Sequence, residues 1–424
     1  MKSELSDILG KALPFLRGEL HAIDPDLPKL VSLLRAAGAG ECWHKDGCFM
    51  SHLTDVYRIL KLWGAPDPIA RCGLYHSVYS NSYVNLALFD AKTDGRETLR
   101  SLIGADAERL VHLFCIVPRQ PLIHDDLIFL YSDDELIDHL RCSESSLVNL
   151  RNSGISIPNE PWRQKLQSVL PPQGIKVKHI ITGEEVKLSR RMVAAFVLMT
   201  MADFSDQLYS FQDDLFNNEN GRLEFTGNNF MALWPGDGRP GLWMNSISRM
   251  GAVYNLIVRE EEMYIEERSR MASGDHHDEN GIIDDNNDRD EDMALVIPPV
   301  FEYCTEVLGT EEQKVARDLY WEAVSCRGMV KAVEEKLKES CAKNRFVGEP
   351  FLVLGQVYAS TGRFEEAEKV AGEGLRLIME WGSSWDKRMS WEGWVAWGRL
   401  VLMNAKNKTW PHTSWGILNL GLVR

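Results

Sequence analysis

Three side chains in this sequence, two imidazoles and one carboxylate, are of the types that bind a divalent metal ion. His52 lies on the apolar side of a predicted helix, and His76 follows at the end of the next apolar helix. Asp203 comes much later, near the end of another apolar helix. Imidazole and carboxylate suit divalent transition metals, and a bound metal activates water and neutralises phosphate charge. We therefore expect helices to bring these three residues together in a metal or phosphate site.

Apolar residues recur at three- and four-residue steps around each of these positions, which predicts amphipathic helices. One helix ends at Gly64 and carries His52 on the same side as Val56 and Leu60. The pattern also predicts one continuous helix over residues 94–115 and a strong helix over 189–209. Residues 118–189 have a weaker pattern, in which we expect a short helix at 133–140 and a small β-hairpin within 176–186.

The composition is that of a globular protein that buries apolar cores. The chain has 424 residues, of which 44% are hydrophobic and 26% charged, and two domains are expected at this length. A formal net charge of −15 argues against nucleic acid as a partner, because phosphate backbones require concentrated Lys and Arg. No run approaches 18 apolar residues, so we expect no membrane-spanning helix.

The eight cysteines form no CxxC pair, which is typical of reduced thiols in an intracellular protein. The N-terminal residues lack a long apolar segment of a secretory signal. The expected location is the cytoplasm.

Acidic residues dominate residues 271–294, which contain almost no core-forming side chains. Such a composition predicts a disordered linker. Its acidic run has the composition of a calcium loop, but the Gly and the final Glu are misplaced, so calcium binding is not expected. This linker divides the chain into a predicted helical domain over 1–270 and a second over 295–424.

A repeat-like pattern lies in the second of these segments. Leu354, Gly355, Tyr358, Ala367 and Ala371 have the spacing of a helix–turn–helix unit with small residues where the helices meet. This pattern resembles a tetratricopeptide repeat. The resemblance implies a short α–α array over 295–424 that binds a protein partner.

The order of His52, His76 and Asp203 resembles the HD superfamily of metal-dependent phosphohydrolases, over residues of about 40–210. In that superfamily a first His, a His-Asp doublet and a distant Asp converge from separate helices. The segment from His44 through Gly73-Leu74-Tyr75-His76-Ser77 also resembles an uncharacterised HD-like family of plants and bacteria, in which Ser follows the histidine. There an Arg-bearing helix comes next, and Arg100 fits it. The predicted fold is thus all-α, an HD-like domain followed by a tetratricopeptide-like array.

Ser77 departs from the HD pattern, because it stands where a metal-binding Asp is expected. A neutral hydroxyl is a poor ligand, so a two-metal site is not expected. One Fe, Mn or Zn ion held by His52, His76 and Asp203 fits the sequence, with one position open to water or substrate. The resemblance then gives His44 and Ser77 supporting roles and Arg100 the binding of an anion, on a small and phosphorylated substrate.

Three alternatives remain open from sequence. The same two-His, one-carboxylate set serves non-haem iron oxygenases. The pocket could also work without metal, with His76 as acid or base and Arg100 binding an anion. In the third alternative the site is degenerate, and the protein is an interaction scaffold that works through its C-terminal repeats.

Overall fold

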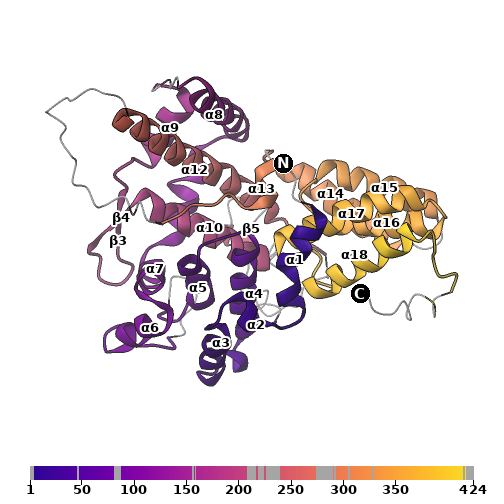
Figure 1. The fold of residues 1–424 in the computed structure, drawn as a ribbon, viewed down its shortest axis with the longest axis horizontal. Helices are drawn as coiled ribbons and strands as arrows, with labels where there is room; N and C mark the ends of the chain where they lie inside the picture. The colour runs from indigo at the N-terminus through magenta and orange to yellow at the C-terminus, as the bar shows by residue number, and fades with distance from the viewer. Residues whose placement is uncertain are drawn as a thin grey trace. The chain divides into compact units, whose positions relative to one another are not determined.

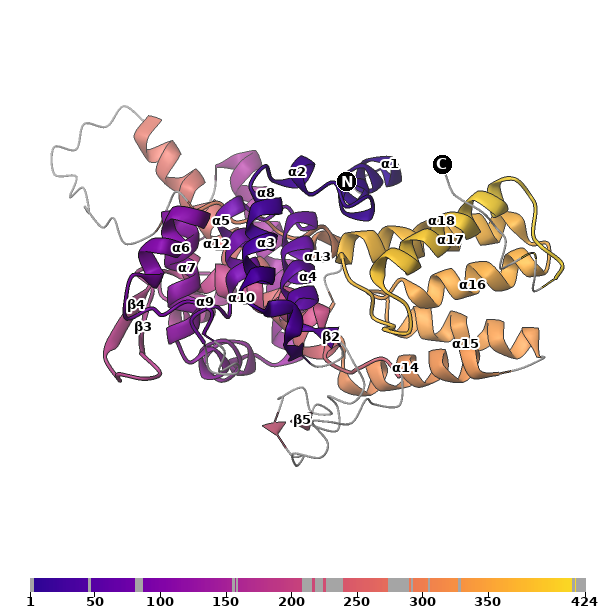
Figure 2. The ribbon, with the colours of Figure 1, turned by 90° about the horizontal axis from the view of Figure 1, so that it is seen from below.

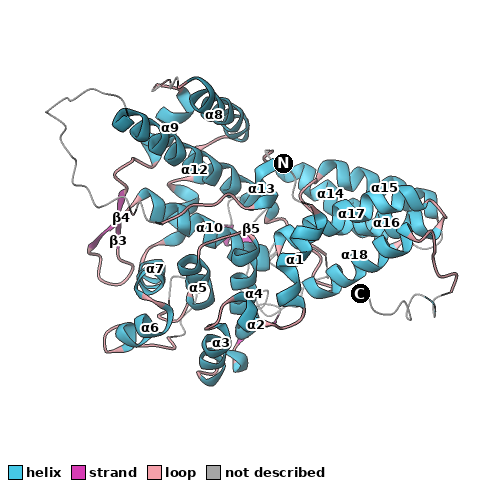
Figure 3. Ribbon diagram, viewed as in Figure 1, coloured by secondary structure: helices cyan, strands magenta, loops and turns pink. Residues whose placement is uncertain are grey.

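The fold is all-α, as predicted (Figure 3). The strands among the described residues form only small antiparallel pairs. The structure, a computed structural model, describes residues 4–44, 47–80, 87–154, 157, 159–207, 216–217, 224–225, 239–273, 290, 293–303, 306–326, 329–413 and 416.

The chain forms two compact units, and each unit collects segments that are distant in sequence. The first unit comprises residues 1–63, 202–247 and 308–424, and the second comprises residues 64–201 and 248–307. The predicted division into 1–270 and 295–424 is contiguous along the chain, and the compact units cut across it.

The first unit begins with helices and a short hairpin and ends with a row of longer helices. Its elements are α1 (Leu5–Leu16), α2 (Leu20–Ile23), α3 (Leu27–Ala36), the helical turn η1 (Ala39–Glu41), β1 (Trp43–His44), β2 (Gly47–Cys48), α4 (Phe49–Leu62), β5 (Phe216–Asn217), β6 (Glu224–Phe225), α14 (Thr310–Ser325), α15 (Val330–Lys343), α16 (Glu349–Ser360), α17 (Phe364–Trp381) and α18 (Trp391–Lys406).

Helices α14 to α18 pack in chain order, each against the next, and α18 also contacts α16 (Figures 1 and 2). Small residues let these helices approach closely. A Cβ atom added at Gly355 would lie 3.2 Å from Cβ of Ala371. The sequence pattern predicted close approach at Gly355 and Ala367, and Gly355 meets α17 at Ala371, one turn after Ala367. The tetratricopeptide resemblance itself stays a prediction.

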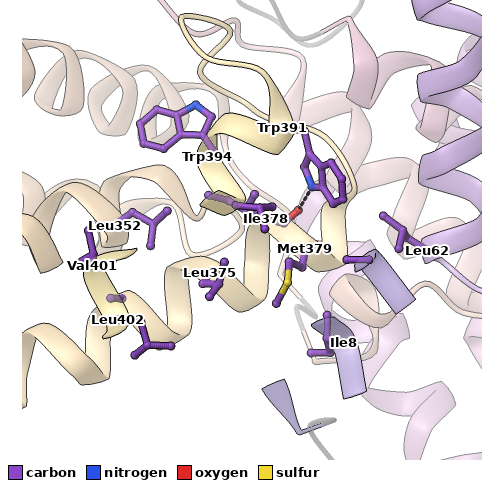
Figure 4. Close-up of a cluster of buried hydrophobic side chains, with 13 residues drawn as sticks. Ile8, Leu62, Leu352, Leu375, Ile378, Met379, Trp391, Trp394, Val401 and Leu402 are labelled. Carbon is purple, nitrogen blue, oxygen red and sulfur yellow. Dashed lines mark hydrogen bonds between the residues drawn. The ribbon is translucent and has the colours of Figure 1, made fainter. Parts of the chain in front are cut away.

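The core of this array extends to the N-terminal helix (Figure 4). Ile8 and Ala12 of α1 belong to the same buried cluster as Leu375 and Trp391, and the Trp391 indole donates a hydrogen bond to the carbonyl of Ile378 at 2.8 Å. An amphipathic helix must bury its apolar stripe, and the partner need not be near in sequence. For that reason residues 1–63 belong to the same compact unit as the C-terminal helices.

The second unit is built from helices and one hairpin. Its elements are α5 (Asp67–Tyr75), α6 (Gly95–Ile103), α7 (Ala105–Ile116), the helical turns η2 (Pro121–Asp125) and η3 (Ile128–Leu130), α8 (Asp133–Ser153), α9 (Pro161–Val169), β3 (Ile175–Lys178), β4 (Glu185–Leu188), most of α10 (Arg190–Asp206), most of α12 (Met244–Ser273) and α13 (Pro299–Tyr303). The predicted hairpin is confirmed, with Ile175 opposite Leu188 and Lys178 opposite Glu185.

Two expectations about helices in this unit were wrong. The continuous helix over 94–115 is divided into α6 and α7 at Gly104, whose φ of 93° and ψ of 159° no helix contains. The short helix at 133–140 is instead the 21-residue α8. Its start is fixed by a capping box, in which the Ser132 hydroxyl accepts from the Glu135 N–H and the Glu135 side chain accepts from the Ser132 N–H.

Most of the predicted linker, residues 274–289 and 291–292, lies outside the described residues. Asp290 is described, and it accepts hydrogen bonds from Arg109 at 2.7 Å and from Ser189 at 2.5 Å. No described helix combines the length and the apolar character needed to cross a membrane.

Candidate metal centre

His52 is positioned by the amphipathic helix α4. Its side chain is almost fully buried, on a helix whose residues Val56 and Leu60 are also buried. The residues four and eight positions further along a helix lie on the same face. The sequence pattern therefore predicted the burial of this imidazole correctly.

Both ring nitrogens of His52 face carboxylates from the end of α10. Nε2 lies 3.1 Å from Oδ1 of Asp203, and Nδ1 lies 2.7 Å from Oδ2 of Asp206. The two aspartates are three residues apart, which places them on one face of the helix. Gln207 also belongs to this group, because its Nε2 donates to Oδ1 of Asp203 at 2.6 Å.

The electrostatics of this group favour a protonated His52. Burial disfavours the charged ring, but the hydrogen bonds and negative charges of Asp203 and Asp206 outweigh burial and raise the pKa of His52 to about 9. Burial likewise opposes the ionised form of Asp206, yet its hydrogen bond to His52 holds the pKa of that carboxyl below its usual value. In this state an imidazolium lies between two carboxylates.

His76 is buried at the C-terminal end of α5. Its Nδ1 lies 2.7 Å from the carbonyl oxygen of Gly73, one turn earlier in the chain. A carbonyl only accepts, so Nδ1 carries the proton and Nε2 carries the lone pair in the neutral ring. The ring packs edge-on against Phe114, with the ring centroids 6.2 Å apart.

Two members of the predicted ligand set, His52 and Asp203, come together within the first unit, where Nε2 of His52 lies 3.1 Å from Oδ1 of Asp203. The third, His76, belongs to the second unit. Two imidazoles and a carboxylate could hold a divalent transition metal. The bond from His52 to Asp206 is the kind of contact that fixes the ring of a metal-binding histidine through its second nitrogen.

Asp206 was missed by sequence reasoning, although a signal was present. It lies one helical turn after Asp203, at the end of a helix whose residues 192–199 are all apolar. Two carboxylates at this spacing share a face, and a buried face of that kind needs a cationic partner.

Two residues that were predicted to support the metal lie beside the proposed ligands. The ring centroid of His44, on β1, is 4.5 Å from that of His52. Ser77 directly follows His76 and is 1% exposed. Its carbonyl oxygen accepts the N–H of Ser80 at 3.1 Å, which turns the chain after α5. The catalytic roles of His44 and Ser77 stay predictions.

Arg100 has a different environment from the one expected. It lies on α6, is 44% exposed, and pairs with Glu97 at 3.1 Å and with Glu108 at 3.4 Å. Glu108 is fully buried and also binds Arg96 at 2.7 Å. Arg100 therefore helps to neutralise a buried carboxylate, and its predicted binding of an anion stays untested.

A polar pocket of about 250 Å³ opens beside His52 within the first unit. Imidazole, hydroxyl and charged side chains from two parts of that unit line it: His44, Ser51, His52, Asp55 and Arg58 from 44–58, and Ser383, Ser384, Lys387, Ser390 and Glu392 from 383–392. Asp206 and Gln207 also contribute to the lining.

Arg58 organises one side of this pocket. Its guanidinium donates to Asp55 at 2.6 Å, to Glu392 at 3.1 Å and to the carbonyl oxygen of Gly382 at 2.9 Å. It also lies over the ring of Trp391, 4.7 Å from the centroid. Burial raises the pKa of Asp55 to about 6 despite the nearby charge of Arg58.

Comparison with known proteins places one part of the chain in context. A family described as a domain of unknown function, DUF6817, matches residues 33–119, which include His44, His52, His76, Ser77 and Arg100 but not Asp203. No curated protein and no solved structure matches the chain. The matched family carries no described activity, so the resemblances to HD phosphohydrolases and to tetratricopeptide repeats stay predictions. Residues 33–119 are similar to a family whose function is unknown.

Proposed function

We propose that this protein is a diverged metal-dependent hydrolase that acts on a small, phosphorylated molecule. One divalent ion, Fe, Mn or Zn, would be held by His52, His76 and Asp203. The carrying observation is that the buried His52 has Nε2 only 3.1 Å from Oδ1 of Asp203, beside a polar pocket of the same unit.

The hydrogen bonds of the two histidines support this proposal. Nδ1 of His52 is bound to Asp206 and Nδ1 of His76 is bound to Gly73, so each ring has Nε2 as its remaining ligand atom. Metal-binding histidines commonly have this arrangement, because the second bond fixes the tautomer and orients the ring. His52 must lose its ring proton to become a ligand, and Asp206 keeps the ring oriented when it does.

A bound divalent ion would supply an activated water and would neutralise negative charge on a phosphate. The protein's own residues supply the rest. Asp206 orients His52, Gln207 orients Asp203 through its hydrogen bond to Oδ1, and the pocket beside His52 offers space for a small polar substrate.

The experiment is metal analysis of the purified full-length protein. About one equivalent of iron, manganese or zinc is expected, and His76→Gln and Asp203→Asn should lose it. His139→Gln is the matched control, because His139 is also a buried helical histidine but is not a member of the ligand group. The proposal is refuted if the wild-type protein binds no metal after incubation with these ions and a chelator does not change its stability.

A second candidate function is a catalytically degenerate scaffold that binds a protein through α14–α18. It is favoured by the fact that an imidazolium between two carboxylates is satisfied without a metal. This candidate predicts a partner that co-purifies with the full chain and is lost on surface substitutions along the array. It also predicts that His76→Gln leaves partner binding unchanged.

A further inference from the structure

Loop 382–390, which joins α17 and α18, supplies one wall of the pocket beside His52. Ser383, Ser384, Lys387 and Ser390 all line the pocket. The sequence pattern assigned this region to a separate repeat array and gave it no part in the chemistry. Its position makes it a candidate for contacts with the substrate.

Buried polar contacts hold this loop in place. Asp386 is fully buried; its carboxylate accepts from the Tyr320 hydroxyl at 2.6 Å and from Nε of Arg388 at 2.9 Å. Glu349 is also buried, and its Oε1 accepts the N–H groups of Trp385 at 2.7 Å and Asp386 at 3.2 Å. The loop therefore has a defined conformation before any ligand binds, which lowers the entropic cost of binding.

The two serines at the start of the loop donate hydrogen bonds to backbone carbonyl groups of the protein. The Ser383 hydroxyl donates to the carbonyl oxygen of Ser205 at 2.8 Å, and the Ser384 hydroxyl donates to that of Met389 at 3.2 Å. Nζ of Lys387 in turn donates to the Ser383 hydroxyl at 3.1 Å. This bond holds the ammonium group beside Ser383, and both residues line the pocket.

Charge pairing sets Lys387 apart from the other cation of the pocket. Arg58 makes two short ion pairs, with Asp55 and Glu392. Within the described part of the chain, the ion pair that Lys387 makes is to Oδ1 of Asp206 and spans 4.0 Å. Asp206 is already hydrogen-bonded to His52. The charge of Lys387 also acts on Asp55 across the pocket, but among the described residues no short ion pair engages its ammonium group, and its side chain is 12% exposed.

We infer that Lys387 binds the phosphate group of the substrate in this pocket. The inference rests on the proposed function, since it assigns a ligand to the same site. A compact ammonium group with three donors suits the oxygens of a phosphate. Arg100, the residue that the sequence suggested for this role, is instead paired with Glu97 and Glu108.

A divalent ion held at the proposed metal site would add positive charge beside this pocket, which His52 also lines. A phosphate therefore binds more tightly to the metal-loaded protein than to the metal-free protein, because charges in a partly buried site are weakly screened.

The test measures the binding of inorganic phosphate to the full-length protein, by calorimetry, with and without manganese. Lys387→Gln should weaken phosphate binding about tenfold or more, the loss typical of one charge-assisted hydrogen bond. Lys387→Arg keeps the charge and should weaken it much less. Lys369→Gln, at an exposed lysine of α17 outside the pocket, is the matched control and should leave it unchanged.

Phosphate that binds equally well to the wild type and to Lys387→Gln overturns the inference, as does a wild type that binds no phosphate in either state. The inference is also overturned if Arg100→Gln weakens phosphate binding and Lys387→Gln does not. Manganese binding is titrated separately. If manganese does not bind, the proposed function fails, and the effect of Lys387→Gln on phosphate binding to the metal-free protein decides this inference alone.

Discussion

Nδ1 of His52 lies 2.7 Å from Oδ2 of Asp206, and the two side chains are only 4% and 12% exposed. A short contact between an imidazole and a carboxylate in such a buried place fixes both groups. The bond orients the ring so that its other nitrogen, Nε2, lies beside Asp203. Under the proposed function the same bond would serve two states, an imidazolium in the metal-free protein and a neutral ligand in the metal-bound protein.

Asp206→Asn should weaken metal binding without removing a ligand. The amide oxygen can still accept from Nδ1, but the lost negative charge makes His52 a weaker ligand. Losses for such outer contacts are about 10- to 100-fold in metal affinity. Competition for manganese against a chelator of known affinity measures this loss.

Asp203→Asn provides the comparison, because it removes a proposed ligand and should cost more affinity than Asp206→Asn. An Asp206→Asn variant that binds manganese as tightly as the wild type would show that Asp206 does not support a metal-binding His52.

The stability of the metal-free protein should depend on pH through His52. The pKa of this histidine is about 9 in the folded protein and about 6.5 in the unfolded chain. Protonated His52 therefore stabilises the folded protein fully below pH 6.5, and this contribution is lost as the pH rises through 9. The pKa difference contributes on the order of 3 kcal/mol to the free energy of unfolding.

Urea denaturation of the metal-free wild type and of His52→Gln, from pH 6 to pH 10, measures this contribution. The stability difference between the two proteins should be largest near pH 6 and should shrink toward pH 10. A difference that is constant over this range would mean that His52 is not protonated in the folded protein.

Metal binding should release a proton from His52 near neutral pH. The ring is protonated below its pKa of about 9, and a metal ligand must be neutral. Calorimetric titration with manganese in two buffers of different ionisation enthalpy gives the number of protons released. About one proton is expected at pH 7, and the apparent affinity should rise about tenfold per pH unit up to 9. Equal heats in the two buffers would contradict a protonated ligand.

The sequence could predict the members of the site that lie on strongly periodic helices. His52 was recognisable from its place on an apolar face, and Asp206 could have been found by its helical spacing from Asp203. Lys387 could not, because it lies in a loop whose position depends on buried contacts of Asp386 with Tyr320 and Arg388. Tyr320 and Asp386 are 66 positions apart in the chain, and no periodic pattern in the sequence encodes a contact between them.

Element type was easier to predict than element ends and partners. The apolar periodicity across 94–115 continues through Gly104, so only the backbone freedom of glycine permits the break between α6 and α7. The apolar residues of α1 recur at helical spacing, but the sequence does not say that α17 covers them, since apolar burial is non-directional.

The close packing of α16 against α17 can be tested at glycine. Gly374→Ala should destabilise the protein, because a Cβ atom there would lie 2.6 Å from the carbonyl oxygen of Gly348 and 3.0 Å from the backbone nitrogen of Leu352. Backbone atoms cannot yield as a flexible side chain does, so the two segments must separate. A cost of about 1–3 kcal/mol is expected for such overpacking, measured by urea denaturation.

Gly372→Ala is the matched control, since Gly372 lies two residues earlier on α17 with nothing within 4 Å of its added Cβ. There alanine should stabilise the helix by about 0.5–1 kcal/mol, because glycine loses more backbone entropy on folding. Opposite signs at two positions of one helix would separate close packing from helix propensity. If both variants are stabilised, α17 does not approach residues 348–352 as closely as the structure indicates.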